Sequence, residues 1–324
     1  MTPDYKITAN DDDITKLIED RFMELRLVDE NGIKSDSFEL RLDDNENVIE
    51  MMSNDVELTI ELGFDGKLEQ MGKFAGLELE FSGPPSVVTV RATSVNLRKS
   101  MKAKKTRSFD LVSFGDLVST VASEYGYDAL VDDLVASIEF AHIAQTTESD
   151  WSLLNRLARD YDAFVKVGGG KLIVAVRSSI GVKKSLVTGD LLPSVVLQPG
   201  DVETWSVKHN DKTKYKAVIA KWYDKDAAIL NEVMSGDGVP SMELAKHYDN
   251  EEDAQRAADA RLKKLQRVTK MVTIKTKGRT DATAMGDLTL KNFRNGVDGS
   301  YTFTRVEHVV KKETGYRCSF EAEL

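Results

Sequence analysis

The segment FMELRLVDENGIKSDSFELRL, residues 22–42, alternates apolar and polar positions on both sides of Asn31-Gly32. A period of two is typical of a strand that buries one face, and Asn-Gly between two such runs predicts a hairpin. The pattern returns over residues 56–81, where Asp65-Gly66 marks a second turn, and again over residues 86–95. At least five short strands in this part of the chain predict an antiparallel barrel or sandwich.

Helical periodicity replaces this alternation near residue 96. Within residues 113–125, apolar side chains recur at i, i+3, i+4, i+7 and i+8, which predicts one amphipathic helix. Ser113 followed by Asp116 is a capping-box start, and Gly126 is a stop signal. The first strand-rich part is therefore expected to end before this helix.

A second helix is predicted over about residues 148–161, with Thr147 and Asp150 as its cap pair. Two alternating runs follow and meet at Gly168–Gly170, which is the pattern of a hairpin. Residues 96–184 are therefore expected to form a small α+β domain.

Strand alternation returns at about residue 185 and continues to the C-terminus, interrupted by a third predicted helix at residues 250–266. Asn250 and Asp253 form the cap pair of this helix, and its alanines allow close packing against a sheet. The chain is thus predicted to be mostly β with an α+β insert. Two strand-rich parts, residues 1–95 and 185–324, flank the middle domain.

Charge is uneven along the chain. The formal net charge is −10, but residues 1–80 hold 22 acidic and 8 basic residues, which leaves a net charge of +4 for the remainder. An acidic chain is not expected to bind nucleic acids in general. The acidic and basic regions can dock on neighbouring copies in an assembly, or they can be solvated faces that keep the protein in solution.

The length of 324 residues predicts two or three domains. No apolar run approaches the roughly 20 residues of a membrane span. The N-terminal residues MTPDYKITANDDD lack the basic start and apolar middle of a signal peptide, so the chain is expected to fold in a cytosol. Cys318 is the one cysteine, which excludes an intrachain disulfide and a cysteine-based zinc site.

No motif in the sequence indicates a catalytic, cofactor or metal site. Residues 168–172 (GGGKL) lack the spacing of a phosphate loop, and the acidic loop that begins at Asp43 lacks the glycine and glutamate of a calcium loop. The histidines are too far apart for a zinc motif and are expected to be structural residues: His142, His209, His247 and His308. We therefore expect a protein that is not an enzyme, with no catalytic residue, no cofactor and no metal.

Two segments leave alternatives open. The helix at 113–125 with the GYDALVD that follows resembles a peptidoglycan-binding LysM unit, but an ordinary core helix has the same pattern. The basic segment from Lys263 to Arg279 has the charge to contact DNA. It lacks interleaved aromatic residues, which favours a solvated face or a docking face between chains.

The order of segments resembles the late control protein D family of phage tail proteins, which includes the baseplate hub proteins of Mu-like contractile-tail phages. More distantly, it resembles the first part of VgrG spike proteins. Three segments carry the resemblance: TTESDWSLLNRLARDYDAFVKVGGGKLIV at 146–174, EEDAQRAADARLKKLQR at 251–267, and GSYTFTRVEHVVKKETGYRCSFEAEL at 299–324. Order and spacing agree over most of residues 90–324, whereas the N-terminal part matches mainly in strand pattern.

This resemblance implies a structural baseplate hub protein of a phage or prophage tail, located in the virion and assembled in the host cytoplasm. It implies that residues 1–95 and 185–324 form tail-tube-like antiparallel β-barrels. Three chains would form a ring that joins a sixfold tail tube to a threefold spike, and DNA and a tape-measure protein would pass through without specific binding. Since the chain ends after the last predicted strand, a separate spike protein is expected.

The acidic residues of 1–80 are expected to face that channel and repel DNA. The alternatives are a tail-associated protein that binds peptidoglycan or degrades the cell wall, and a VgrG-like component of a secretion system.

Overall fold

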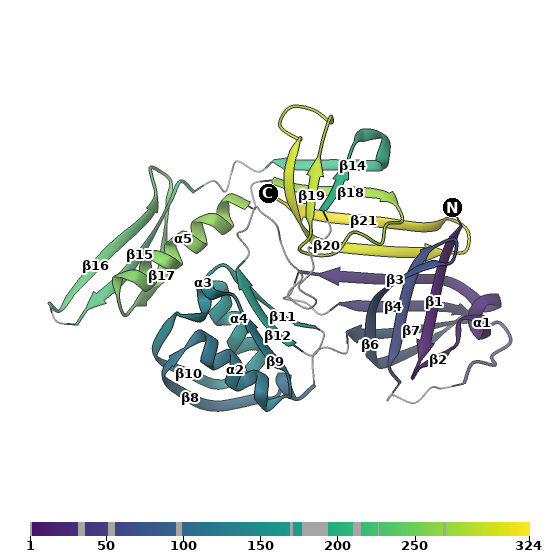
Figure 1. Cartoon of the computed structure of the whole chain (residues 1–324), viewed down its shortest axis with the longest axis horizontal. Coiled ribbons are helices and arrows are strands. Elements are labelled where there is room, and N and C mark those ends of the chain that lie inside the picture. Colours follow the sequence, from purple (N-terminus) through teal and green to yellow (C-terminus); the bar gives the residue numbers. More distant parts are fainter. Residues whose placement is uncertain are drawn as a thin grey trace. The chain divides into compact units, whose positions relative to one another are not determined.

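The computed structural model describes residues 2–31, 36–50, 56–94, 99–168, 171–176, 194–209, 215–225, 227–267 and 270–324. The chain divides into two compact units (Figure 1). The first contains residues 1–97, 192–207 and 272–322, and the second contains residues 98–191 and 208–271 with the last two residues. The protein is mostly β, as predicted, with 58% strand and 20% helix. Among the described residues, no helix is both long and apolar enough to span a membrane.

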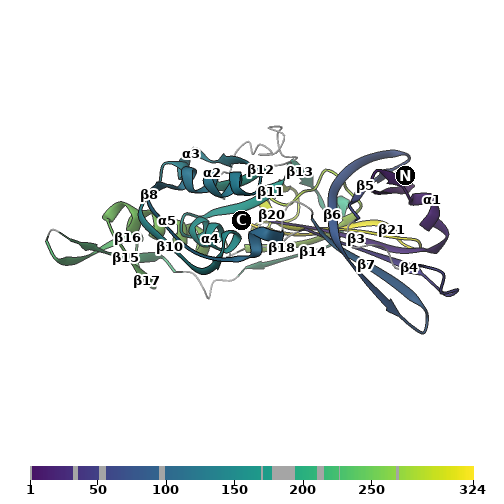
Figure 2. The ribbon, with the colours of Figure 1, turned by 90° about the horizontal axis from the view of Figure 1, so that it is seen from below.

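The first unit is built on one 13-stranded sheet, seen from two directions in Figures 1 and 2. Its strands, in order along the sheet, are β14 (Val202–His209), β18 (Lys270–Lys277), β21 (Gly315–Glu323), β20 (Gly299–Lys311), β3 (Phe22–Glu30), β4 (Ser37–Asp43), β7 (Val87–Ser94), β6 (Lys67–Ser82), β5 (Leu58–Phe64), β1 (Pro3–Ala9) and β2 (Asp12–Asp13). Two further strands, β13 (Ser194–Leu197) and β19 (Asp287–Leu290), join it through β20. Short helical segments lie at Thr15–Ile18 (α1), Glu19–Arg21 and Pro199–Asp201.

The alternation of residues 22–42 produces strands with one buried face. In β4, Phe38, Leu40 and Leu42 are buried, while Glu39 and Arg41 point to the other side. The predicted turn at Asp65-Gly66 is confirmed, with φ angles of 51° and 77° that suit a tight hairpin between β5 and β6. The turn predicted at Asn31-Gly32 continues outside the described residues.

Strands from the two ends of the chain lie side by side in this sheet. β20 pairs antiparallel with β3, from Arg305 opposite Glu30 to Lys311 opposite Glu24. One hydrophobic core also draws on both ends, with Phe38 and Phe303 among its fully buried residues. The strand pairings do not define two closed barrels, so the division at residues 95 and 185 stays a prediction.

The second unit contains three smaller sheets. β8 (Lys104–Ser113) pairs with β10 (Glu139–Ser149), and β12 (Lys171–Val176) lies between β11 (Ala163–Gly168) and β9 (Asp128–Val131). β15 (Ala217–Asp224) lies between β16 (Ile229–Gly236) and β17 (Ser241–Tyr248). The helical elements are a short turn at Lys99–Lys102, α2 (Phe114–Glu124), α3 (Asp133–Ala136), α4 (Asp150–Asp160) and α5 (Glu251–Arg267). The predicted hairpin of β11 and β12 is confirmed, while its turn lies outside the described residues.

The helix α5 is confirmed where it was predicted, and its Asn250 side chain accepts a hydrogen bond from the Asp253 amide. Its alanine-rich face packs on the sheet of β15 to β17, where Ala254 and Ala258 meet Val218 and Ala220. This sheet is separate from the 13-stranded one.

Two strand–helix segments of this unit, β8 with α2 and β10 with α4, have the same construction. α2 and α4 are both 11 residues long, and each begins after a serine whose Oγ accepts a hydrogen bond from the amide three residues on. Tyr125 and Tyr161 occupy the corresponding C-cap positions, and the two preceding strands pair antiparallel with each other. The sequence did not reveal this repeat because the two segments share spacing and few residues.

The predicted start of α4 was wrong by two residues. Ser149, and not Thr147, is the N-cap, and its Oγ accepts from the Ser152 amide. Thr147 lies at an irregularity of β10, with a φ of 50°, and its amide donates to the hydroxyl of Thr106. The extra residue of such a bulge holds the chain in the strand for longer than the cap pattern suggests.

Candidate functional site

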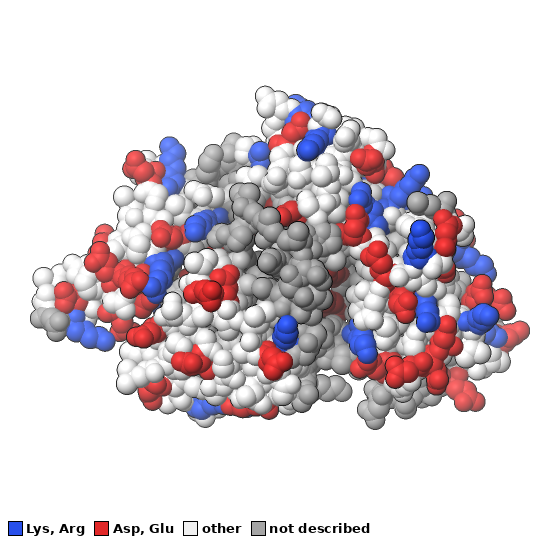
Figure 3. All heavy atoms as spheres, viewed as in Figure 1, with Lys and Arg blue, Asp and Glu red and all other residues white. Residues whose placement is uncertain are grey.

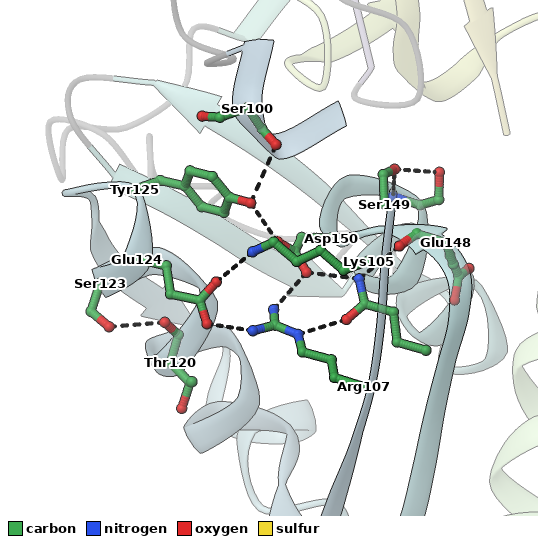
Figure 4. Close-up of polar contacts among 12 residues, drawn as sticks. Ser100, Lys105, Arg107, Thr120, Ser123, Glu124, Tyr125, Glu148, Ser149 and Asp150 are labelled. Atoms are coloured by element: carbon green, nitrogen blue, oxygen red, sulfur yellow. Dashed lines mark hydrogen bonds and ion pairs between the residues drawn. The ribbon is translucent and has the colours of Figure 1, made fainter. Parts of the chain in front are cut away.

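Asp150, in the segment that carries the family resemblance, is fully buried although it is charged. Figure 4 shows the groups that surround it, which come from β8, β10 and the two helices. Its carboxylate accepts hydrogen bonds from Lys105 at 2.7 Å and Arg107 at 2.6 Å. The Tyr125 hydroxyl donates to it at 2.5 Å and the Gln145 amide at 2.8 Å. The lone pairs of Asp150 are therefore used within the protein.

Glu124 at the end of α2 closes the network. It accepts from Lys105 at 2.7 Å and from Arg107 at 2.5 Å, so two cations face two carboxylates. Burial alone would raise the pKa of Asp150, but hydrogen bonds from Lys105 and Tyr125 outweigh burial and hold its pKa below the usual value. The same balance lowers the pKa of Glu124. The cluster is neutral and saturated, so it is suited to holding two strands and two helices together.

The repeat places aromatic rings where the other half has charges. Phe114 occupies the position in α2 that Asp150 occupies in α4, and it packs against Phe140 and Tyr161. One half of the repeat is thus joined by rings and the other by ion pairs. The polar half requires strict geometry, because a buried charge that loses its partner is unfavourable.

A second buried polar cluster lies in the first unit. His308 is fully buried, and its Nδ1 lies 2.8 Å from the Tyr316 hydroxyl and 3.3 Å from the Cys318 sulfur. Burial lowers the pKa of His308 to about 4 and raises the pKa of Cys318 to about 12. Both groups are therefore neutral near pH 7, and a protonated thiol is a poor nucleophile and metal ligand. This arrangement is that of a packed structural cluster.

The other histidines lie on separate strands. His142 on β10 contacts the exposed Asp110 at 2.5 Å, while His209 lies on β14 and His247 on β17. Within the part of the chain that the structure describes, no group of three or more His, Cys, Asp or Glu side chains is placed to hold a metal ion. In the acidic loop, Asp44 accepts from the amides of Val48 and Ile49, so it stabilises a turn.

The two segments for which the sequence left alternatives open, the helix at 113–125 and the basic segment from Lys263 to Arg279, lie largely in regular secondary structure. Phe114, Leu117 and Val121 of α2 are fully buried, as in a core helix. The basic segment is divided between α5 and β18, and its last member, Arg279, pairs with Asp281 at 2.6 Å.

The face of the large sheet that points away from the hydrophobic core carries charged side chains on several neighbouring strands. Five strands, β20, β3, β4, β7 and β6, place acidic and basic side chains on it in alternation. We call it the paired-charge face, and its members are Glu24, Arg26, Glu30, Glu39, Arg41, Asp43, Glu78, Glu80, Arg91, Arg305, Glu307 and Lys311. On the side of this unit seen in Figure 3, basic side chains lie among acidic ones.

Two stretches of this sheet have an open edge. β14 is the last strand at one end. Within the strand order, β6 pairs with β5 through residues 67–74 and with β7 through residues 74–82, so its second half has one neighbour among the described strands. Large apolar side chains are exposed at both places: Trp205 on β14 is 39% exposed and Phe81 on β6 is 45% exposed. Such edges are places where another strand can pair.

Comparison with known proteins agrees with these features. Residues 32–314 match the model of a family described as "Phage tail baseplate hub (GPD)". The chain is 28% identical over 367 aligned positions to the "Probable baseplate hub protein" of Escherichia phage P2, with 100% of this chain and 94% of that protein covered.

Two solved structures show the same fold. The 43 kDa tail protein of prophage MuSo2 from Shewanella oneidensis matches with a TM-score of 0.70 at 13% identity, over 99% of this chain and 98% of that one. A component of the type VI secretion system of E. coli matches with a TM-score of 0.54 at 9% identity, over 93% of this chain and 73% of that one.

Proposed function

The chain belongs to the phage tail baseplate hub (GPD) family, and from this premise we propose that three copies close into a ring around a channel. It is a baseplate hub protein of a phage tail, which confirms the resemblance to late control protein D. In our proposal the ring joins the tail tube to the spike. Tape-measure protein and DNA pass through the channel, and assembly takes place in the host cytoplasm.

The open edges of the 13-stranded sheet carry this proposal. β14 lies at one end of the strand order, and the second half of β6 has one neighbour among the described strands, so each chain offers two different open edges. Pairing the β14 edge of one copy with the β6 edge of the next is a head-to-tail contact, and such contacts form a ring when the rotation closes. Such a ring covers both of these edges, which removes a liability of a large sheet.

The exposed side chains at these edges support the same contact. Leu77 is buried in the core of its own chain, but Phe81, four residues further along β6, is 45% exposed. Trp205 packs edge-on against Phe293 at 5.4 Å and still has 39% of its surface exposed. Aromatic side chains of this kind are enriched at the centres of protein interfaces.

The division of labour within the chain follows. We propose that residues 1–95 and 185–324 act as two tube-like modules, so that three chains present six similar modules to a sixfold tube. The pairing of β3 with β20 joins the modules inside one chain and supports the idea that the contact between chains is also strand to strand. We propose that the protein is not an enzyme and holds no cofactor or metal. The saturated state of the Asp150 cluster supports this.

The mass of the purified protein in solution tests the ring. Light scattering should give about three times the chain mass of 36.1 kDa. Phe81→Glu should give a folded monomer, because it places a charge at the β6 edge. Leu111→Glu is the matched control, since Leu111 is 89% exposed and lies on β8 in the second unit, and this variant should remain a trimer. A wild-type protein that is monomeric at every concentration, or a trimer that Phe81→Glu leaves intact, would contradict the proposal.

A peptidoglycan clearing assay tests the absence of catalysis. The purified hub should leave a turbid cell-wall suspension unchanged, while a commercial muramidase clears it. Clearing by the wild-type protein would support the alternative of a cell-wall-degrading tail protein.

A further inference from the structure

The paired-charge face combines many ion pairs on a single sheet surface. Arg91 on β7 reaches Glu39 at 2.9 Å on one side and Glu80 at 2.6 Å on the other. On the neighbouring strands, Arg41 and Lys311 both reach Glu24, at 3.8 and 3.2 Å. The cations of the face therefore have carboxylate partners across the strands.

Arg305 and Arg26 are held in the same way. Arg305 lies 3.3 Å from Glu30 and 3.2 Å from Glu307. Its third partner is Glu321 of β21, at 3.5 Å, and Arg26 forms an ion pair with Glu307 as well. Each of the five cations on the face is thus paired with at least one carboxylate.

The position of this face in the layers of the unit is the second observation. The core face of the same sheet is covered by further strands, because Leu58 and Ile60 of β5 and Ile7 of β1 belong to the same hydrophobic core as Phe38 of β4. Among the described residues, the hydrophobic core of this unit lies on the opposite face, and a hollow of about 390 Å³ lined by Arg26, Arg91 and Arg305 dips into the paired-charge face.

When a sheet of this kind closes into a ring, its outer face has a larger circumference than its inner face. The side that carries the second layer of strands needs the larger circumference and therefore lies outside. The hollowed side then lies inside. This step rests on the proposed ring.

We infer that the paired-charge face lines the channel of the hub ring, and that its carboxylates keep the arginines from binding the phosphates of passing DNA. Free arginines bind phosphate in a bidentate manner, and every phosphate contact adds affinity that must be broken before DNA moves on. An arginine whose N–H groups already donate to carboxylates, such as Arg305, has fewer donors left to bind a DNA phosphate. In this inference the carboxylates act by pairing with the arginines, whereas the expectation from the sequence was that acidic residues repel DNA.

Removing the carboxylates should convert the lining into a DNA-binding surface. The test uses phage that carry Glu30→Gln with Glu307→Gln in the hub. These changes keep the side-chain shape, free Arg26 and leave Arg305 with Glu321 alone, at 3.5 Å. DNA ejection from purified particles should slow several-fold at low salt and return towards the wild-type rate as salt is raised, because phosphate contacts weaken with salt. The matched control is Glu57→Gln with Glu61→Gln, which frees Lys73 and Lys6 elsewhere in the same unit and should not alter ejection.

A thiol-labelling experiment separates this inference from the ring itself. Thr93 on β7 is exposed on the paired-charge face, and the native Cys318 is 2% exposed, so Thr93→Cys adds the one reactive thiol. In assembled tails this thiol should react with a small maleimide but not with a large polymer-linked maleimide, whereas in the free chain it should react with both. Rapid reaction with the large reagent in intact tails would place the face outside, and unchanged ejection by the glutamine variant would show that the carboxylates mask nothing. Either result overturns the inference while leaving a trimeric mass intact.

Discussion

Replacing Asp150 with asparagine tests whether the buried cluster holds the middle of the second unit together. The change keeps the shape of the side chain but removes its charge, so Lys105 and Arg107 lose a carboxylate that they contact at 2.7 and 2.6 Å. Breaking a fully buried ion pair costs about 3–5 kcal/mol. Here the Lys105 and Arg107 side chains remain 32% and 25% exposed, so water compensates in part and we expect a loss of about 2–3 kcal/mol.

The assay is urea unfolding followed by circular dichroism and by tryptophan fluorescence, because Trp151 adjoins the cluster. The matched control is Glu148→Gln, two residues away in the same motif. Glu148 pairs with Arg156 at 2.8 Å, and the Arg156 side chain is 46% exposed. Glu148 is 20% exposed and is less buried than Asp150, so water can replace part of this pair and the variant should unfold nearer to the wild-type urea concentration than Asp150→Asn does. Equal stability of the two variants would refute the role given to Asp150.

The pH dependence adds a second check on the same variant. The pKa of Asp150 in the folded protein is below its ordinary value of about 3.9, so its stabilisation is present above that pH and is lost as the pH falls towards the lowered pKa. The difference between wild type and Asp150→Asn should therefore be constant from pH 7 to about pH 5 and shrink below about pH 4. A difference that grows on acidification would mean that the cluster stabilises the protonated form.

Three further perturbations have defined outcomes. Burial lowers the pKa of His308 to about 4, so on acidification the unfolded chain binds a proton at a higher pH than the folded protein does. The free energy of unfolding should therefore fall by about 3 kcal/mol between pH 6.5 and pH 4. The fall should be smaller in His308→Gln when its unfolding is measured over the same pH range. Gly278→Ala should destabilise the first unit by at least about 2 kcal/mol in thermal unfolding, because its Cβ would lie 2.1 Å from the Tyr316 ring, whereas Gly200→Ala meets no atom within 4 Å and should be neutral. Cys318, with a pKa raised to about 12 and 2% exposure, should react with thiol reagents only at the rate of unfolding, and immediate labelling of the native protein would contradict its burial.

Local patterns in the sequence predicted local structure well. The alternation around Phe38 and the spacing of α2 depend on neighbours along the chain, and both are confirmed. The start of α4 was wrong because a bulge in β10 depends on its partner strand β8. A sequence motif therefore predicts an element's boundary only where that boundary depends on residues nearby in the sequence.

The candidate site could not be predicted from the sequence, because it depends on the pairing of strands that are far apart in the chain. Asp150 was assigned to a helix cap because its partners Lys105 and Arg107 become neighbours only through the register of β8 with β10. The paired-charge face was missed for the same reason, since Arg305 meets Glu30 only when the last strands of the chain join the first. Each strand on its own shows an ordinary solvated face.

Cross-linking within intact tails tests the closed ring most directly. Ser82→Cys and Ser206→Cys in the same chain place exposed thiols on the β6 and β14 edges, and the native Cys318 is buried. A flexible bis-maleimide should link each copy to its neighbour, and denaturing gels should show bands of one, two and three chains with none larger. A ladder that continues beyond three chains, or one that stops at two, would contradict a ring of three hub proteins closed edge to edge.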